Sequence, residues 1–359
     1  MIIKELSLLN YKNISQKQFV LDNKINCFVG KNGIGKTTVL DAVYHIAYGK
    51  SYFNPLATQN IKHNEDFFVI EALIQNKDIE ENVVCSLKRG QKKVVKRNGK
   101  IFDKLSDYVG FMPVVMISPA DVDLINDGSD SRRKFIDNII ITVDKNYLNL
   151  LITYHKILAQ RNALLKYFAV NGVFDKDNLE IYDEKLIPLS EKIFEIRREF
   201  IEEFSDIFYK HHQEITNKED NVSIQYVSDL HQENFETNLK NSLAKDRVFQ
   251  YTTKGIHKDD LIFNIDNHII KKYGSQGQQK SFLIALRLAQ FEFLKKSSGI
   301  LPILLLDDIF DKLDEFRVKH IISMINNNTF GQIFISDTHE NRIRESIEHT
   351  NKTFKIFNL

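Results

Sequence analysis

The stretch INCFVGKNGIGKTT, residues 25–38, decides how the rest of the chain is interpreted. Its spacing of Gly30, Gly35, Lys36 and Thr37 follows the pattern G-x-x-x-x-G-K-[ST]. In this pattern a glycine-rich loop turns its backbone N–H groups toward phosphate oxygens, because glycine tolerates the tight curl. The lysine reaches the β- and γ-phosphates, and the hydroxyl after it holds Mg²⁺. The sequence therefore predicts a loop that binds a nucleotide polyphosphate.

The residues on either side of this loop support the interpretation. The apolar run Ile25–Val29 is typical of a buried strand, and Leu40, Val43 and Ala47 recur at helical spacing until Gly49. A loop that opens a helix gains the positive end of the helix dipole, which favours an anion. The residues that we expect to contact the phosphates are Gly30, Lys31, Asn32, Gly33, Ile34, Gly35, Lys36, Thr37 and Thr38.

The composition is that of an ordinary globular protein. Of 359 residues, 43% are hydrophobic and 27% are charged, and the net charge of +1 gives no overall basic field for nucleic acid. The two cysteines, Cys27 and Cys85, form no C-x-x-C pair and suit a reducing compartment. The sequence shows no signal-peptide core and no apolar run of about 18 residues, the length of a membrane span. We expect a soluble, cytoplasmic protein with no membrane contact.

A second apolar run ends in two carboxylates. ILLLDD, residues 303–308, places Asp307 and Asp308 directly after a predicted buried strand. Beside a phosphate loop, a carboxylate at such a strand end binds Mg²⁺ directly or through water, and we assign this role to Asp307 together with Thr37. Asp308 is then placed to orient or deprotonate the attacking water. The predicted catalytic residues are Asp308, Asp307 and Lys36.

Two further segments supply candidate nucleotide contacts. SQGQQ, residues 275–279, contains glycine and opens a helix, which makes it a second possible anion site. Lys12 lies in the turn NYKNIS, close in sequence to the phosphate loop. The candidate contacts outside the loop are Lys12, Ser275, Gln276, Gly277 and Gln278.

The most basic segment is KRGQKKVVKRNGK, residues 88–100, which holds seven Lys or Arg and no acid. Such a patch would bind a DNA backbone in a salt-sensitive manner that ignores sequence. A solvated hairpin whose lysines protect a sheet edge explains the pattern equally well. The candidate DNA contacts are Lys88, Arg89, Lys92, Lys93, Lys96 and Arg97.

The middle of the chain changes from strands to long helices. Apolar residues follow helical stripes in 146–168 and in 182–208, which predicts an antiparallel pair of about 25 residues, or about 40 Å, each. Pro188 either begins or kinks the second helix. We therefore expect an α/β fold with an inserted helical lobe. Residues 1–128 and 250–359 would form one head with a mixed sheet, and residues 129–249 a lobe with a short antiparallel arm.

Four of these segments together resemble the motifs of the ABC-type ATPases. The resemblance implies Walker A at 30–37, the signature at 275–279, Walker B at 303–308 and the D-loop at 311–314. In that superfamily, the signature of one subunit covers the γ-phosphate held by Walker A of another. The resemblance therefore implies ATP and Mg²⁺ as cofactors, and a head-to-tail homodimer that forms on ATP.

Within this superfamily the chain resembles the RecF family of bacterial recombinational-repair ATPases over essentially its whole length. The similarity rests on LSLLNYKNIS, ISPADVDLINDGSDSRRKFID, LAQRNALLK, TTKGIHKDD and YGSQGQQKSFLIALRLAQ, besides both Walker motifs. It implies slow ATP hydrolysis, DNA binding at gaps or single-strand/duplex junctions, a role in the SOS response, and RecR with RecO as partners. The family's GPHRDD is GIHKDD here, and Asp308 stands where most ABC ATPases have glutamate.

Two other functions remain open on these grounds. A transporter or translation-type ABC ATPase would use the same hydrolysis, although the 239 residues between Lys36 and Ser275 exceed the compact layout of such domains. A scaffold with a vestigial nucleotide site is the other, and the intact loop lysine and paired acids argue against it.

His339 in SDTH, residues 336–339, is either a γ-phosphate sensor or a surface histidine.

Overall fold

The computed structural model describes the whole chain apart from residues 103–106, 218, 232–233, 310–314, 327–328 and 351. It divides into two compact units. Unit 1 comprises residues 1–122 and 280–359, and unit 2 comprises residues 123–279. Residues 250–279, which the sequence pattern predicted as part of the head, cluster with unit 2 instead.

Unit 1 contains an antiparallel sheet of six strands in the order β2-β1-β4-β5-β6-β7. Buried residues recur at every second position in much of β1, β4 and β5, as expected for a sheet with one face on the core. The Asn98-Gly99 turn joins β6 to β7 with positive φ at both residues, which confirms the predicted hairpin. The strands are β1 (Ile2–Tyr11), β2 (Ile14–Val20), β4 (Phe67–Asn76), β5 (Ile79–Lys88), β6 (Val94–Arg97) and β7 (Lys100–Ile101).

A second sheet of unit 1 is wholly parallel and carries the glycine-rich loop. Its five strands run in the order β14-β3-β13-β12-β8. Every residue of β3, β8, β12 and β13 is buried, which explains their nearly continuous apolar sequences. Antiparallel and parallel strands thus coexist in the head, as predicted, but in two sheets, because β1 pairs with β2 and β4. The strands are β3 (Ile25–Val29), β8 (Val114–Ile117), β12 (Ile303–Leu306), β13 (Ile333–Asp337) and β14 (Phe354–Asn358).

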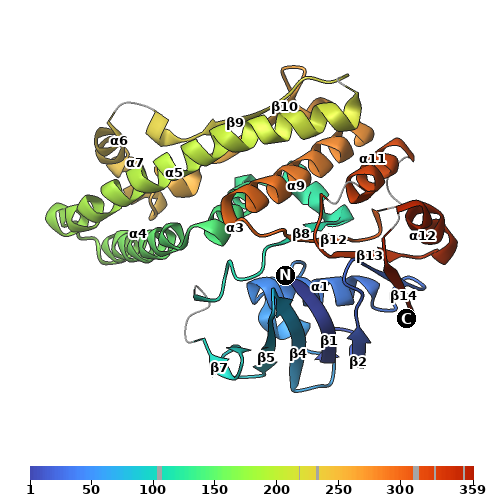
Figure 1. Cartoon of the computed structure of the whole chain (residues 1–359). Helices are drawn as coiled ribbons and strands as arrows, with labels where there is room; N and C mark the ends of the chain where they lie inside the picture. The colour runs from blue at the N-terminus through green and yellow to red at the C-terminus, as the bar shows by residue number, and fades with distance from the viewer. Residues whose placement is uncertain (103–106, 218, 232–233, 310–314, 327–328, 351) are drawn as a thin grey trace. The chain divides into compact units, whose positions relative to one another are not determined.

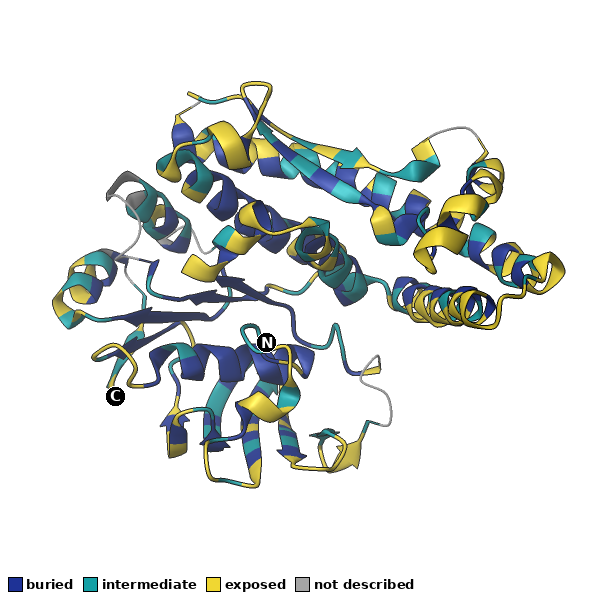
Figure 2. Cartoon of the chain, turned by 180° about the vertical axis from the view of Figure 1, so that it is seen from behind, coloured by how far each residue is buried: buried dark blue, intermediate teal, exposed yellow. Residues whose placement is uncertain are grey.

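Helix α1, Lys36–Tyr48, lies between these two sheets (Figure 1). It contacts β1, β4 and β5 of one sheet and β8 and β13 of the other. All of its residues except Thr37 are buried, and Figure 2 shows most of the parallel sheet buried as well, β14 being the exception. Burial lowers the pKa of His45 to about 3, so this helical histidine is neutral. The other helices of unit 1 are η1 (Ala57–Asn60), η3 (Pro119–Val122), α9 (Gln276–Ser298) from residue 280, α11 (Glu315–Asn326), α12 (Glu340–Ile347) and η6 (Glu348–Thr350).

Unit 2 consists of helices and a three-stranded antiparallel sheet in the order β11-β10-β9. The central strand of this sheet is β10, which is why residues 250–279 belong to unit 2. Helices α4 (Lys145–Asn171) and α5 (Lys176–Thr216) form the predicted antiparallel arm (Figure 1). Helix α5 is longer than predicted, with 41 residues, and Pro188 lies inside it. The remaining elements are α2 (Asp123–Asn126), α3 (Ser129–Val143), β9 (Val222–Val227), η4 (Asp229–His231), α6 (Phe235–Asn241), α7 (Leu243–Phe249), η5 (Ile256–Lys258), β10 (Asp260–Ile265), β11 (His268–Ile269) and α8 (Ile270–Tyr273).

Among the described residues, no helix is both long enough and apolar enough to cross a membrane.

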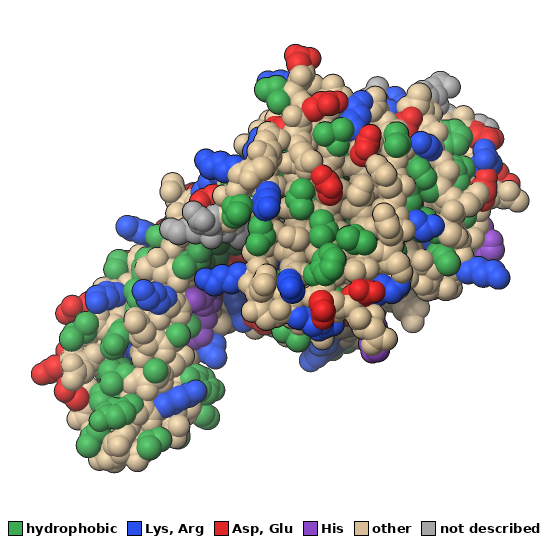
Figure 3. Space-filling model, turned by 90° about the horizontal axis from the view of Figure 1, so that it is seen from below, with side chains coloured by type: hydrophobic (Ala, Val, Ile, Leu, Met, Phe, Trp, Pro, Cys, Tyr) green, Lys and Arg blue, Asp and Glu red, His purple; other side chains and the backbone are tan. Residues whose placement is uncertain are grey.

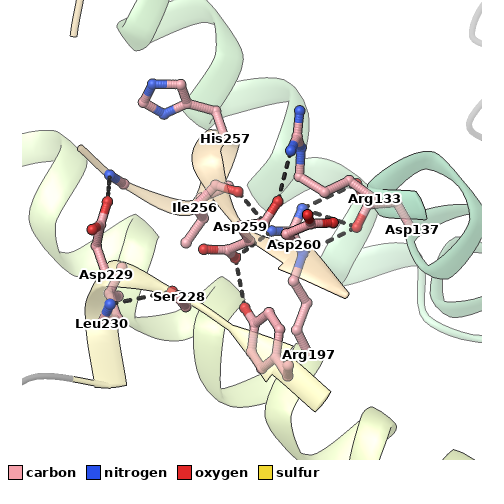
Figure 4. Close-up of polar contacts among 12 residues, drawn as sticks. Arg133, Asp137, Arg197, Ser228, Asp229, Leu230, Ile256, His257, Asp259 and Asp260 are labelled. Atoms are coloured by element: carbon pink, nitrogen blue, oxygen red, sulfur yellow. Dashed lines mark hydrogen bonds and ion pairs between the residues drawn. The ribbon is translucent and has the colours of Figure 1, made fainter. Parts of the chain in front are cut away.

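A buried arginine holds the GIHKDD segment of unit 2 in place (Figure 4). Arg197 of α5 donates from Nη1 to Asp259 Oδ2 at 2.7 Å and to the carbonyl of Ile256 at 2.8 Å. Its Nη2 donates to Asp137 Oδ2 at 3.0 Å, and the Tyr226 hydroxyl donates to Asp259 Oδ2 at 2.6 Å. Burial raises the pKa of the Asp259 carboxyl, and Arg197 opposes that shift. One charge network therefore joins α3, α5, β9 and the GIHKDD segment.

A second buried arginine explains the RNALLK stretch of the arm. Arg161 donates from Nε to Asp183 at 2.6 Å and from Nη1 to Asp246 at 2.7 Å and Thr252 at 2.9 Å. These partners come from α5, from α7 and from the segment after α7. The arginine thus ties α4 to both neighbouring helices without exposing its charge.

We expect Arg197→Met to destabilise the protein by about 3–5 kcal/mol, because two carboxylates would lose the cation that compensates their burial. Urea unfolding followed by far-UV circular dichroism measures the loss. The matched control is Arg198→Met on the same helix. Among the described residues, Arg198 forms ion pairs only with Glu195 and Glu202, on the exposed face of the helix, so its removal should leave the unfolding midpoint unchanged. Equal effects of the two substitutions would contradict this account of the network.

Candidate functional site

The glycine-rich loop has the backbone that its sequence predicts. Gly30, Gly33 and Gly35 have φ of 154°, 80° and 119°, values that favour glycine. A Cβ on Gly35 would lie 3.3 Å from side-chain atoms of Asn13 and Ile14, so the position is also sterically closed. Helix α1 begins directly after the loop, with Gly35 as its N-cap. The N–H groups of the first turn, which lack partners within the helix, therefore belong to the loop's anion-binding surface.

The Lys36 side chain turns back into the loop and is buried there. Its Nζ donates to the carbonyl of Gly30 at 2.9 Å and lies 3.3 Å from the carbonyl oxygen of Lys31. A further contact of 3.5 Å joins it to Asn32 Oδ1. The ammonium group is thus enclosed by the loop, where it is suited to compensate phosphate charge.

Asp307 connects the loop to the parallel sheet. Its Oδ1 accepts hydrogen bonds from Thr37 Oγ1 and Ser336 Oγ, both at 2.8 Å, and its Oδ2 accepts one from Ser118 Oγ at 3.4 Å. These hydroxyls come from α1, from β13 and from the residue after β8. Burial raises the pKa of the Asp307 carboxyl, and the hydroxyls of Ser336 and Thr37 oppose that shift.

The donor set around Asp307 fits Mg²⁺. One carboxylate and three hydroxyls provide only oxygen atoms, which a hard divalent cation prefers. Within the described residues, no cluster of three or more His, Cys, Asp or Glu side chains could hold a metal by itself. The arrangement therefore suits a cation shared with phosphate oxygens, the usual situation for Mg²⁺ in nucleotide sites.

Asp308 differs from its neighbour in both backbone and solvation. Its φ of 46° lies in the left-handed region, which non-glycine residues rarely adopt. The backbone N–H donates to Ser336 Oγ at 2.9 Å. Its Oδ1 is buried and, like Oδ2 of Asp337, has no hydrogen-bond partner in the part of the chain that the structure describes. A carboxylate oxygen of this kind is suited to accept a proton from water.

A buried polar chain that the sequence analysis missed extends from Asp307 to helix α9. Beyond Ser118, whose hydroxyl contacts Asp307, the Ser118 N–H donates to Asp121 Oδ2 at 3.0 Å. Arg287 of α9 donates from Nη2 to Asp121 Oδ1 at 2.7 Å. The available signal was the SPAD turn, in which a carboxylate three residues after Ser118 closes on that residue's own N–H. Ser118 thus occupies the position beside Asp307.

Lys12 and Asn13 play different parts beside the loop. Lys12 Nζ lies 2.6 Å from Asp41 Oδ2, so it is paired with helix α1. Asn13 braces the loop, because its Nδ2 donates to the carbonyl of Gly33 at 2.8 Å and its Oδ1 accepts from Thr38 Oγ1 at 2.7 Å. Both side chains line an open pocket of about 790 Å³, whose other lining residues are polar apart from Ile61. Lys12 was predicted from the sequence as a nucleotide contact, whereas the contacts of Asn13 with the loop were not predicted.

The SQGQQ segment opens α9 with a capping box. The Ser275 N–H donates to Gln278 Oε1 at 2.9 Å, and the Gln278 N–H donates to Ser275 Oγ at 3.2 Å. Gln278 is further fixed by Asp220, to which its Nε2 donates at 2.9 Å. Ser275 and Gln276 are exposed, so this helix start is accessible to another molecule, and Gly277 lies in its first turn.

The basic hairpin keeps only part of its charge free. Lys93 donates from Nζ to the carbonyl of Gly49, and Arg97 donates from Nη2 to Glu81 Oε1 at 2.8 Å. The hydrogen bond from Arg97 lowers the pKa of Glu81. Arg97 thus stabilises the hairpin itself, and Lys93 connects it to the end of α1. Of the other candidates, Lys88, Arg89 and Lys92 are exposed and Lys96 is half-buried, and Arg89 Nε donates to the carbonyl of Glu65 at 3.0 Å.

Two further predicted elements are the D-loop and the γ-phosphate sensor His339. The D-loop, residues 311–314, falls outside the described residues. His339 is exposed, and its backbone N–H donates to Asp337 Oδ1 at 2.7 Å at the start of α12. A γ-phosphate sensor at this position stays a prediction.

Comparison with known proteins identifies relatives of this chain in both sequence and fold. Residues 2–358 match the family model of the RecF/RecN/SMC N terminal domain. The chain is 62% identical to the DNA replication and repair protein RecF of Flavobacterium johnsoniae, over 100% of both chains. A solved structure of the recombination mediator protein RecF with ATP, in the RecFOR pathway, superposes with a TM-score of 0.87 at 30% identity, covering 94% of this chain and 92% of that chain. An Smc head bound to the C-winged helix domain of ScpA shares the fold, with a TM-score of 0.55 at 14% identity over 100% of this chain and 94% of that chain.

These similarities span the glycine-rich loop, the paired acids and the arm alike. They favour the repair interpretation over a transport or translation ATPase. The chain belongs to the RecF family of DNA replication and repair proteins, which are ATPases of the ABC type.

Proposed function

We propose that this protein binds DNA in an ATP-dependent manner during recombinational repair and replication restart, with slow ATP hydrolysis. The observation that carries the proposal is the 2.8 Å hydrogen bond between Thr37 and Asp307, beside the enclosed ammonium of Lys36. It joins a phosphate-binding loop to a carboxylate 270 positions away in the sequence. A lysine, a hydroxyl and a carboxylate at one strand edge are the groups that bind ATP with Mg²⁺ in P-loop ATPases.

The nucleotide would lie along the glycine-rich loop, residues 30–38. Its phosphates would face the loop N–H groups and Lys36, and its nucleoside the open pocket that Lys12 and Asn13 line. Thr37 and Asp307 would hold Mg²⁺, which neutralises charge on the transferred phosphoryl group.

Asp308 is our candidate for the residue that orients and deprotonates the attacking water. Its Oδ1 has no partner among the described residues and is free to accept a proton. Aspartate is one methylene shorter than the glutamate of most ABC ATPases, so the carboxylate would stand farther from the water. Slow turnover follows, which suits a timer more than a motor.

We further propose that two copies dimerise head to tail on ATP. The exposed start of α9, with Ser275 and Gln276, would cover the γ-phosphate bound by the other copy. One chain alone would then bind ATP and hydrolyse it poorly.

DNA gaps or single-strand/duplex junctions are the proposed target in the cytoplasm, with induction of the SOS response as the setting. The free lysines of the basic hairpin, Lys88 and Lys92, supply a candidate backbone contact. RecR with RecO are the proposed protein partners, because the solved relative is described as part of the RecFOR pathway.

Lys36→Met should lower kcat by about 10²-fold or more, because an ammonium aimed at developing negative charge is lost. Asp308→Asn should keep ATP binding and lower kcat by about 10²-fold, since the amide accepts no proton. Asp308→Glu should raise kcat. The rate of phosphate release gives kcat, and titration with a fluorescent ATP analogue gives the affinity for ATP. If Asp308→Asn hydrolyses ATP at the wild-type rate, Asp308 has no part in the mechanism. If Lys36→Met hydrolyses ATP at the wild-type rate, the proposed site as a whole is refuted.

Ser275→Arg should abolish dimerisation on ATP while ATP binding persists, because a long cation replaces the capping hydroxyl at the surface that meets the second copy. Sedimentation velocity of wild type and variant with ATP and gapped DNA measures the effect. Thr153→Arg on the exposed face of α4 is the control for adding an arginine elsewhere. A wild type that stays monomeric with saturating ATP and gapped DNA would contradict the composite site.

Replacement of Lys88 and Lys92 by alanine should weaken DNA binding at all sequences and reduce the slope of log K against log salt by about 1–2, as expected for two lost phosphate contacts. Fluorescence anisotropy with ATP at several salt concentrations provides the slope. Lys17→Ala changes an exposed lysine of β2 in the same sheet and serves as the control. An unchanged slope would support the solvated-hairpin alternative.

A further inference from the structure

The arm of unit 2 carries an apolar groove between α4 and α7. It encloses about 360 Å³, and all of its lining residues except Arg247 are hydrophobic. Leu165, Phe168 and Val173 line it from the side of α4, and Val248 lines it from α7. The groove is built within unit 2 and shares no residue with the proposed ATP site.

Large hydrophobic side chains on the helices that form this groove are exposed to solvent. Val170 is 82% exposed and Val248 is 78% exposed, and Tyr167 and Phe249 are 57% and 50% exposed. Figure 3 shows hydrophobic side chains gathered on the arm, the left part of that view, with both basic and acidic side chains among them. Dense apolar exposure of this kind marks interaction sites on soluble proteins.

Two cations of α7, Arg247 in the groove lining and Lys245 two residues before it, have aromatic neighbours and no acidic partner among the described residues. The Arg247 guanidinium lies 4.0 Å from the ring centroid of Phe174, and the Lys245 ammonium lies 5.9 Å from that of Phe249. Neither forms an ion pair with any residue that the structure describes. The adjacent acid, Asp246, is buried and held by Arg161 at 2.7 Å. The groove is therefore apolar inside and positive at its rim.

We propose that this groove binds an acidic amphipathic segment of a partner protein. Apolar side chains of that segment would enter between α4 and α7, and a carboxylate would meet the fork of Arg247. An anchoring arginine among aromatic and aliphatic residues is typical of protein interfaces. DNA is less complementary, because backbone recognition needs several cations and gains nothing from valines. A second copy of the chain is also less complementary. In a twofold interface each copy presents the same surface, so the positive rim would face another positive rim where the groove needs an acid.

The test uses two fluorescein-labelled helical peptides and the full-length protein without nucleotide. Both peptides carry leucines at spacings of three and four, one with glutamates beside them and its twin with lysines. Wild type should bind the glutamate peptide about fivefold more tightly than the twin, as expected for one favourable ion pair. Arg247→Glu should reverse this order. Val248→Glu should weaken the glutamate peptide by about tenfold or more.

Ile152→Glu is the matched control, since Ile152 is 54% exposed on α4 and lines no part of the groove. It should bind both peptides as wild type does. The proposal fails if wild type binds neither peptide, if Arg247→Glu leaves the order unchanged, or if Ile152→Glu and Val248→Glu behave alike. Self-association of the wild type that Val248→Glu abolishes would assign the groove to a second copy instead. ATPase activity of all three variants should match the wild type, which separates this test from those of the nucleotide site.

Discussion

The buried carboxylate of Asp307 is the constraint on which the arrangement of unit 1 depends. An ionised group removed from water is tolerated only when hydrogen bonds replace its hydration. Here the donors are Thr37, Ser118 and Ser336, which belong to three different elements. Because carboxyl ends of parallel strands meet at one edge of a sheet, the order β3-β13-β12-β8 brings these donors and the glycine-rich loop together. The position of the loop is thus tied to the solvation of one acid.

The same loop is held from behind by helix α1. A helix between two sheets has no face for water, so each polar side chain on it needs a partner within the protein. Asp41 meets this demand by accepting from the hydroxyls of Tyr11 and Ser51 and from the N–H of Tyr52, besides its ion pair with Lys12. The helix start is consequently fixed on both sides before any phosphate binds. A rigid set of N–H groups needs little reorganisation to bind an anion, which is the main benefit of preorganisation.

Local patterns predicted the local parts of this molecule. The strand, loop and helix around Lys36, the turn at Asn98-Gly99 and the paired acids all follow from spacing within a few residues. Pairing of strands is not local, so the separation into two sheets could not be inferred from the alternation in residues 2–21. Likewise Arg287 meets Asp121 across 166 positions, and neither residue carries a periodic signal that points to the other. Lys93 and Arg97 were included among the candidate DNA contacts because the sequence does not reveal which charged side chains form hydrogen bonds within the fold.

The two adjacent acids at the end of β12 show how one strand edge produces two kinds of carboxylate. Asp307 continues the strand direction and has both oxygens engaged, so a cation arriving there meets a carboxylate that hydroxyls already orient. Asp308 leaves the strand through a left-handed backbone conformation. Its N–H donates a hydrogen bond to the hydroxyl oxygen of the same Ser336. One oxygen of its side chain is left buried without a partner among the described residues. Environments that differ this much separate the tasks of neighbouring carboxylates, because the hydroxyls hold Asp307 in a fixed orientation for a cation, whereas Asp308 keeps an oxygen that no described residue engages.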